Sequence, residues 1–232
     1  MIKSVIWSSM LDYPGHVCST IFFDKCNFKC EYCQNQDLCK MKEIDFEKEI
    51  LPNLIERKDF VKYIVLSGGE CTIDKEFQKN IDILYEKGFK IGIHTNGYKP
   101  EIIEKNISKI SYIGMDIKND LKKYDEICAV KIDISKIEKS IDLIVENLEE
   151  YEFRTTVYPK IVDKKECINI AKYLADKKAK KYVLQQYKKV EGVLTIPFSK
   201  EKMEEIEEEC NKIIPTTLRW FWGRRKKASL WF

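Results

Sequence analysis

Histidine is the scarcest metal-binding residue in this chain, with only His16 and His94 among 232 residues. Two histidines cannot build a three-histidine zinc centre, and a Ser–His–Asp hydrolase would depend on one of them. The chain also lacks an uninterrupted run of the roughly 18 apolar residues that a membrane helix requires. The first residues lead into Val5, Ile6 and Trp7 without the apolar core of a signal peptide. We therefore expect a cytoplasmic protein without a membrane partner.

Cysteine, in contrast, is abundant, with nine residues. Cytoplasmic thiols are kept reduced, and a chain of this length can bury an adequate core without disulfides. Because histidine is so scarce, some of these cysteines are the first candidates for binding a metal.

Short segments rich in β-branched residues alternate with longer lysine- and glutamate-rich segments that carry apolar residues at helical spacing. The expected strands are residues 17–23, 63–66, 90–94, 112–116, 153–157 and 182–186. The expected helices are residues 46–56, 75–87, 100–108, 137–148, 165–177 and 200–213. Strands joined by helices imply parallel pairing, and this length is too short for a closed eight-fold barrel. We predict a single-domain α/β fold, a partial (β/α)6 TIM-like barrel of parallel strands, with its chemistry at the carboxyl ends of the strands.

The regular pattern ends near Pro215, so we expect a domain of residues 1–215 and an aromatic, basic tail of residues 216–232. The cations of the tail are Arg219, Arg224, Arg225, Lys226 and Lys227. Without these five, the 41 basic residues of the chain fall to 36, against 38 acidic ones. We expect Trp220 and Phe221 to cap the barrel, with docking of a partner as the alternative.

Three cysteines, Cys26, Cys30 and Cys33, follow the first strand with CxxxCxxC spacing. Three close thiolates indicate a metal. A structural zinc site needs a fourth ligand, and the nearest later candidate, Cys39, lacks a CxxC partner. An iron–sulfur cluster held by three cysteines instead leaves one iron open to a substrate. The adjacent Lys25 and Lys29 either stabilise such a cluster, receive an electron donor, or are ordinary solvated lysines.

Polar residues also follow the next three strands. Ser67-Gly68-Gly69-Glu70 follows the second strand, where glycines permit a close approach of backbone to ligand and Glu70 offers a carboxylate to an ammonium group. Alone, this motif is also compatible with an ordinary turn. Thr95-Asn96-Gly97 follows the third strand, and Asp116 and Lys118 end the fourth, where a buried charged pair is costly unless it serves a pocket or a partner.

The cysteine spacing and the glycine turn together resemble the signatures of the radical S-adenosylmethionine (radical SAM) superfamily. The resemblance extends through the segments 11–15, 95–97, 115–118, 153–157 and 182–186. Within the superfamily, these segments are similar to the activating proteins of anaerobic ribonucleoside-triphosphate reductase. That branch of glycyl-radical enzyme activases is related to pyruvate formate-lyase activating enzyme.

The resemblance implies a 4Fe–4S cluster ligated by Cys26, Cys30 and Cys33, which are thus the catalytic and metal-binding residues. It implies reductive cleavage of S-adenosylmethionine to a 5′-deoxyadenosyl radical, which abstracts hydrogen from a glycine of the reductase. The electron donor would be a flavodoxin or a ferredoxin. The implied S-adenosylmethionine contacts are Tyr32, against the adenine, and Gly68, Gly69, Glu70, Thr95, Asn96, Asp116 and Lys118.

The sequence departs from that branch at two positions. His94 stands where related activases usually have Asp, and Cys71 replaces a common Pro. A packed histidine and a buried, unreactive thiol are the expected explanations. The same explanation is expected for Cys18, Cys39, Cys128, Cys167 and Cys210. Arg154 is expected either to hold a carboxylate in the barrel mouth or to form a structural ion pair.

Two alternatives remain at this point. A radical SAM enzyme could act on another glycyl-radical enzyme, a peptide or a small molecule, as 7-carboxy-7-deazaguanine synthase does. More remotely, the three cysteines and Cys39 could hold zinc in a non-enzymatic module whose basic tail binds nucleic acid. This zinc hypothesis leaves the two glycine-containing turns unexplained, so we do not expect nucleic acid as a partner.

Overall fold

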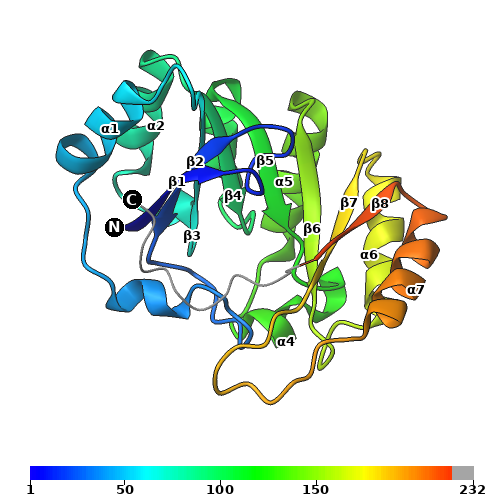
Figure 1. Ribbon diagram of the computed structural model, residues 1–232. Helices are drawn as coiled ribbons and strands as arrows, with labels where there is room; N and C mark the ends of the chain where they lie inside the picture. Colours follow the sequence, from blue (N-terminus) through cyan, green and yellow to red (C-terminus); the bar gives the residue numbers. More distant parts are fainter. Residues whose placement is uncertain (221–232) are drawn as a thin grey trace.

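The computed structural model of the protein describes residues 1–220 (Figure 1). Its centre is one eight-stranded sheet in which the strands follow each other in sequence order. The strands are β1 (Ile2–Ser9), β2 (Cys18–Phe23), β3 (Tyr63–Gly68), β4 (Lys90–Thr95), β5 (Ile110–Asp116), β6 (Tyr151–Val157), β7 (Tyr182–Gln186) and β8 (Thr216–Arg219). Strands β2 to β8 pair in parallel, and β1 is antiparallel to β2. The predicted α/β fold of parallel strands is confirmed.

Helices connect the parallel strands as the sequence predicted. They are α1 (Leu51–Glu56), α2 (Phe77–Glu86), α3 (Pro100–Asn106), α4 (Tyr124–Cys128), α5 (Ile134–Asn147), α6 (Lys164–Asp176) and α7 (Lys200–Asn211). Each of the six predicted helices has a counterpart, and α4 is an addition in the loop after β5. No helix in the described part of the chain is long and apolar enough to cross a bilayer.

The helices begin and pack as their sequences dictate. The Asp163 carboxylate accepts the amides of Lys165 and Glu166, and the Glu166 side chain returns to the Asp163 amide, which completes a capping box at the start of α6. In α5, the buried residues recur at helical spacing, which turns one apolar face toward the sheet. They are Ile137, Ser140, Ile141 and Ile144.

Two strands were not predicted. Strand β1 forms a hairpin with β2, and no helix lies between these two strands. Strand β8 is four residues long and comes after the expected end of the domain, but it pairs with β7 from Tyr182↔Thr216 to Gln185↔Arg219. Residues 216–219, which were expected in the tail, therefore belong to the sheet. Trp220 packs against the core, and the rest of the predicted tail, residues 221–232, lies outside the described residues.

The segment between β1 and β2 packs an aromatic side chain against the sheet. The buried ring of Tyr13 lies 4.8 Å from the rings of both Tyr63 and Tyr112, measured between centroids. Tyr13, Tyr112, Cys18 and Val65 form a separate apolar cluster. The opposite, carboxyl ends of the strands carry the longer loops. In Figure 1, α4 and the long loop after β7 lie at the lower edge, beyond these carboxyl ends.

Candidate active site

The three motif cysteines lie together on the loop that follows β2, at the carboxyl end of the sheet. Cys26 is exposed, whereas Cys30 and Cys33 are half-buried. The Phe28 amide points at Cys26 Sγ from 3.4 Å, and the Cys33 amide donates to the Cys30 carbonyl at 3.1 Å. Local backbone contacts thus curl the loop so that all three thiols occur within one short, accessible segment.

Gly68, the last residue of β3, and Gly69, which follows it, permit the chain leading into the cysteine loop to pack against them. The Gly69 amide donates to the Phe23 carbonyl at 2.7 Å, and the Glu70 amide to the Lys25 carbonyl at 2.6 Å. A Cβ atom on Gly68 would lie 2.3 Å from the Phe23 oxygen, and one on Gly69 would lie 2.1 Å from the Lys25 oxygen. Any larger residue would therefore displace the chain just before Cys26. The glycines are required by this contact between two loops, which the sequence alone did not indicate.

The Glu70 side chain is buried and joins two strand ends. One oxygen accepts from the hydroxyls of Thr72 at 2.6 Å and Thr95 at 2.7 Å, and the other accepts from the Asn96 amide at 2.6 Å. Burial raises the pKa of Glu70, although these hydrogen bonds oppose the rise. The carboxylate thus holds the turns after β3 and β4 together. A contact between Glu70 and a ligand ammonium group stays a prediction.

Asn96 connects the turn after β4 to the cysteine loop. Its Nδ2 donates to Asn27 Oδ1 at 2.8 Å and lies 3.9 Å from Cys26 Sγ, while its Oδ1 accepts from the Tyr98 amide at 3.0 Å. Thr95 is buried beside it, and its hydroxyl also accepts from the Gly97 amide at 3.0 Å. The residues that the sequence named in three separate loops are therefore in direct contact.

Asp116, at the end of β5, is paired with two cations. Its Oδ1 accepts from Arg154 Nε at 2.9 Å, and its Oδ2 lies 2.8 Å from Lys118 Nζ. Burial alone would raise the pKa of Asp116, but the charges of Arg154 and Lys118 hold it well below its usual range. Lys118 is half-buried, as Asp116 is, and the charge of Asp116 raises the pKa of Lys118 although partial burial opposes the rise. Of the two roles expected for Arg154, the structure shows the ion pair, which joins its buried guanidinium to the half-buried Asp116 carboxylate.

Tyr32 is the buried aromatic side chain of the cysteine loop. Its ring packs 5.1 Å from that of Tyr158, and its hydroxyl has no hydrogen-bond partner within the described residues. Burial raises the pKa of Tyr32, while the Lys118 charge, whose field reaches this ring, opposes the rise. A buried hydroxyl without a partner beside a cation is a site that a polar ligand would complete.

His94 and Cys71, where the sequence departs from the activase pattern, are both packed inside the fold. The two ring nitrogens of His94 lie 3.2 Å from Ser67 Oγ and 2.8 Å from the Asp12 carbonyl. Burial, followed by the charge of Arg154, lowers the pKa of His94 to about 4. The Cys71 thiol is buried, and burial raises its pKa well above the ordinary value. Both expectations, a packed histidine and a buried thiol, agree with these positions.

The remaining cysteines do not all match the expectation that they are buried. Cys18, Cys128, Cys167 and Cys210 are buried, but Cys39 is exposed. Sequence reasoning also missed that Cys128 lies beside the cysteine loop, where its carbonyl accepts from the Lys29 amide at 2.9 Å and its thiol lowers the pKa of Cys30 to about 7. Only the fold brings these residues together, because 98 positions separate Cys30 from Cys128 along the chain.

The three-cysteine loop offers the thiolate donors of a 4Fe–4S cluster, in which three cysteines bind three irons and leave the fourth open. Within residues 1–220, no group of three or more His, Cys, Asp or Glu side chains is gathered closely enough to hold a single ion. The unpartnered Tyr32 hydroxyl beside the loop agrees with a bound polar ligand.

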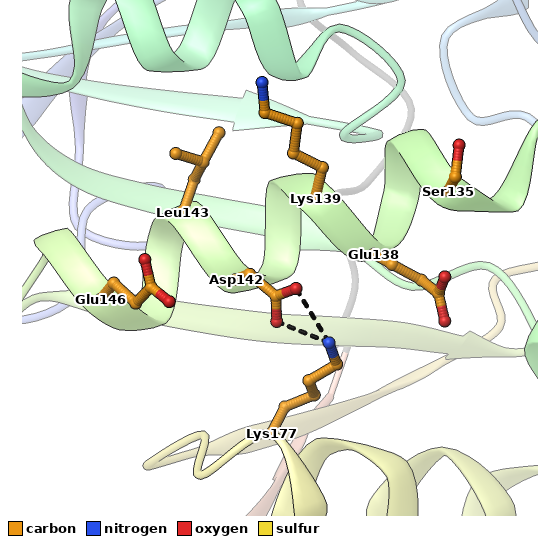
Figure 2. A pocket seen from close by; sticks show the side chains of 7 residues that line it. All are labelled: Ser135, Glu138, Lys139, Asp142, Leu143, Glu146 and Lys177. Atoms are coloured by element: carbon orange, nitrogen blue, oxygen red, sulfur yellow. Dashed lines mark hydrogen bonds and ion pairs between the residues drawn. The ribbon is translucent and has the colours of Figure 1, made fainter.

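Two hollows on the outer layer of helices are distinct from this arrangement. One, of about 420 Å³, lies along α5 beside Lys177, whose ammonium pairs with both oxygens of Asp142 (Figure 2). The other, of about 650 Å³, lies between α5, α6 and the loop after β5. Neither is lined by any of the predicted site residues, so the predicted chemistry stays at the carboxyl ends of the strands.

The sequence profile of the radical SAM superfamily matches residues 20–174, from β2 into α6. The chain belongs to the radical SAM superfamily. It is 35% identical to a Methanocaldococcus jannaschii protein provisionally named as a glycyl-radical enzyme activating enzyme, over 81% of this chain and 80% of that protein. It is 32% identical to the pyruvate formate-lyase-activating enzyme of Clostridium pasteurianum, over 51% of this chain and 52% of that protein.

A solved structure of a Sphaerobacter thermophilus radical SAM methyltransferase has the same fold. It matches with a TM-score of 0.69 and 17% identity, over 91% of this chain and 68% of that one. At this identity the likeness concerns the fold alone, and it supports the TIM-like partial barrel. Radical SAM proteins are enzymes that use a 4Fe–4S cluster held by three cysteines together with S-adenosylmethionine, and these are the cofactors of this radical SAM chain.

Proposed function

We propose that this radical SAM protein is an activase that installs a glycyl radical on an anaerobic ribonucleoside-triphosphate reductase. The observation that carries this proposal is the convergence of the cysteine loop with the turns after β3 and β4, through Asn96, Glu70 and Gly69. The names of the two relatives support the activase class, and the motifs quoted above favour the reductase as its target.

In this proposal, Cys26, Cys30 and Cys33 hold the cluster, which supplies one electron for the cleavage of S-adenosylmethionine. Asn96 fixes the position of the loop relative to the turn after β4. Lys118, held by Asp116, offers a cation to the carboxylate of the ligand. The Tyr32 ring borders the adenine, and its buried position helps to keep water from the reacting atoms.

A protein substrate is favoured over a small molecule by the loop after β7. Its Lys188 carbonyl accepts from Gln34 of the cysteine loop at 2.7 Å, and Thr195 donates to the Tyr158 hydroxyl at 3.0 Å, so the loop is fixed beside the site. It nevertheless exposes Leu194 by 91% and Ile196 by 77%. Two apolar side chains presented next to a reaction site are suited to burial under a polypeptide.

The electron donor in this proposal is a flavodoxin or a ferredoxin. Lys25 and Lys29 are exposed on the cysteine loop, where they could meet such a protein. Because the Cys26 thiol is exposed, an electron-donor protein at this surface would lie a short distance from the cluster.

The test is an anaerobic reconstitution with iron and sulfide. Reduced samples are examined by electron paramagnetic resonance with and without S-adenosylmethionine, and 5′-deoxyadenosine is measured. We expect a cubane signal that S-adenosylmethionine shifts, and then a glycyl-radical signal when an anaerobic ribonucleotide reductase is added. Absence of a cluster contradicts the cofactor assignment, whereas a cluster with 5′-deoxyadenosine but no radical on the reductase contradicts the proposed target alone.

Matched variants assign the ligands. Alanine at Cys26, Cys30 or Cys33 should abolish the signal that responds to S-adenosylmethionine. The control is Cys39→Ala, which removes an exposed thiol six residues beyond the motif and should retain full cluster content. Equal iron loss in Cys39→Ala would contradict the three-cysteine assignment.

A further inference from the structure

The long loop after β7 contains a straight stretch beside the cysteine loop. Residues 193–198 contain no helix, turn or bend. Their side chains alternate between the two sides of the backbone, because Val193 is buried and Thr195 is half-buried, whereas Leu194 is 91% and Ile196 77% exposed. A period of two residues is the pattern of an extended strand with one packed face. The stretch therefore presents its apolar face to the outside.

Contacts on the packed side hold this stretch in place. The Thr195 hydroxyl donates to the Tyr158 hydroxyl at 3.0 Å, and the Tyr158 ring packs 5.1 Å from that of Tyr32 in the cysteine loop. Three residues further along, the Phe198 carbonyl accepts from the Gln186 side chain, at the end of β7, at 3.2 Å. The stretch is thus ordered before any partner arrives, which lowers the entropic cost of binding to it.

The main chain of the stretch is unpaired where the two apolar side chains lie. Within residues 1–220, the backbone N–H and C=O groups of residues 194–196 make no hydrogen bond. The next residue, Pro197, has no N–H and ends the row of donors, as prolines do on the edge strands of sheets. An ordered strand with free N–H and C=O groups is a template for pairing with another chain.

The loop that leads into the stretch carries unpaired cations. Lys188 and Lys189 are exposed, and neither forms an ion pair within the described part of the chain. Glu191 is the exposed acid between them and the stretch, so this part of the loop has a net positive charge. A partner segment with carboxylates at the matching end would complement it.

We propose that residues 194–196 bind an extended segment of the substrate protein by β-strand addition. The apolar side chains of that segment cover Leu194 and Ile196, and its carboxylates face the two lysines at the start of the loop. In this binding mode, main-chain hydrogen bonds supply affinity and alternate side chains select the sequence. The inference rests on the proposed function, because it takes the substrate to be a glycyl-radical enzyme. A segment paired at this place positions the adjoining polypeptide beside the cysteine loop.

The first test is amide hydrogen exchange of the reconstituted full chain, followed by mass spectrometry with and without an anaerobic ribonucleotide reductase. The amides of residues 194–196 should exchange rapidly in the free protein and at least about tenfold more slowly with the reductase. A glycyl radical on the reductase without slower exchange in this stretch would overturn the proposal. Slow exchange in the free protein would overturn it too, because this chain or a second copy would then cover the stretch.

The second test measures the affinity for the reductase in matched variants. Leu194→Asp and Ile196→Asp place a charge where apolar contact is expected, and each should raise the Kd at least about tenfold. The control is Phe60→Asp, since Phe60 is 88% exposed but precedes β3, at the opposite ends of the strands, and it should leave the Kd unchanged. Equal affinities of Leu194→Asp and the unmodified protein would overturn the proposal.

The electron paramagnetic resonance signal separates this proposal from the proposed function. The shift of the cubane signal by S-adenosylmethionine should be the same in all of these variants, because residues 194–196 contact the substrate protein and not the cluster. Failure of the unmodified protein to form that signal, or to place a radical on the reductase, would count against the proposed function instead.

Discussion

Two carboxylates lie at the ends of the strands on either side of β4, Glu70 buried after β3 and Asp116 half-buried at the end of β5, and they are stabilised in different ways. Glu70 is held by neutral donors, the hydroxyls of Thr72 and Thr95 and the Asn96 amide. Asp116 is held by two cations, Arg154 and Lys118. The pKa of Glu70 is raised, with burial as the main cause, and that of Asp116 is lowered because the cations overcome its burial.

The two carboxylates therefore have different effects: Glu70 links two turns by hydrogen bonds, whereas Asp116 determines the local charge. Glu70 binds two turns into one surface without placing a net cation there. The Asp116 group carries one negative and two positive charges, so it leaves a net positive charge near the cysteine loop. Such a charge suits an anionic cluster and the carboxylate of a ligand.

The largest expected effect comes from removing the Asp116 charge. Asp116→Asn removes the carboxylate that pairs directly with the buried Arg154 guanidinium, so the free energy of unfolding should fall by about 3–5 kcal/mol in urea denaturation. The control, Asp142→Asn, breaks a surface pair with Lys177 in which Asp142 is 44% exposed. It should cost at most about 1 kcal/mol. Equal losses in the two variants would contradict the charge-based account of Asp116.

His94, on the strand between the two carboxylates, should give the next largest effect. Its pKa in the folded protein is about 4, below that of the unfolded chain, because burial and Arg154 disfavour its charged form. As the pH falls from about 6.5 to about 4, the unfolded chain takes up a proton that the fold does not, which costs up to about 3 kcal/mol. His94→Gln should remove this part of the pH dependence in urea titrations. If the free energy of unfolding fell equally with decreasing pH in His94→Gln and in the unmodified protein, His94 would not be the cause of this pH dependence.

Glu70→Gln should cost about 1–3 kcal/mol, because an amide cannot accept hydrogen bonds at both of its terminal atoms. The contribution of Glu70 to stability should change with pH in the opposite direction to that of Asp116. Since the pKa of Glu70 is raised, its ionisation costs stability as the pH rises above its ordinary value of 4.5. The stability difference between the unmodified protein and Glu70→Gln should thus shrink with rising pH. A difference that grows with pH would show that Glu70 behaves like Asp116.

The smallest effect is expected from one donor of the neutral group. Thr95→Val removes a hydroxyl that donates to Glu70 at 2.7 Å, and it should cost about 1 kcal/mol in thermal or urea unfolding. Thr217→Val, at an exposed position of β8, should change stability by less than about 0.5 kcal/mol. If Thr95→Val were as harmless as the control, the Glu70 contacts would not be a stabilising unit.

Sequence reasoning anticipated the elements that repeat. All six predicted strands exist within one or two residues of their expected bounds, because buried parallel strands and amphipathic helices have distinct periods. It did not find β1, since a hairpin strand breaks the alternation with helices, or β8, which is too short to show a pattern. The short strand β8 depends on hydrogen bonds to β7, whose paired residues, such as Tyr182 opposite Thr216, lie far back in the sequence.

The site divides in the same way. The spacing of Cys26, Cys30 and Cys33 and the turns after the strands were evident from the sequence, because each is a local pattern. The reason for Gly69 was not, since the atom that a side chain would strike is the carbonyl of Lys25. The pairing of Asp116 with Arg154 and the hydrogen bond from the Lys29 amide to the Cys128 carbonyl likewise join distant segments.

The sequence by itself determined the order of the parallel βα units, the three-cysteine loop and the superfamily signature, because spacing and periodicity are properties of neighbours along the chain. Only the tertiary structure decided which carboxylate holds two turns together, which one pairs with cations, and which further cysteine, Cys128, lies beside the cysteine loop. These outcomes depend on burial and on through-space distance, and both are set when the parallel strands bring their carboxyl ends to one edge of the sheet.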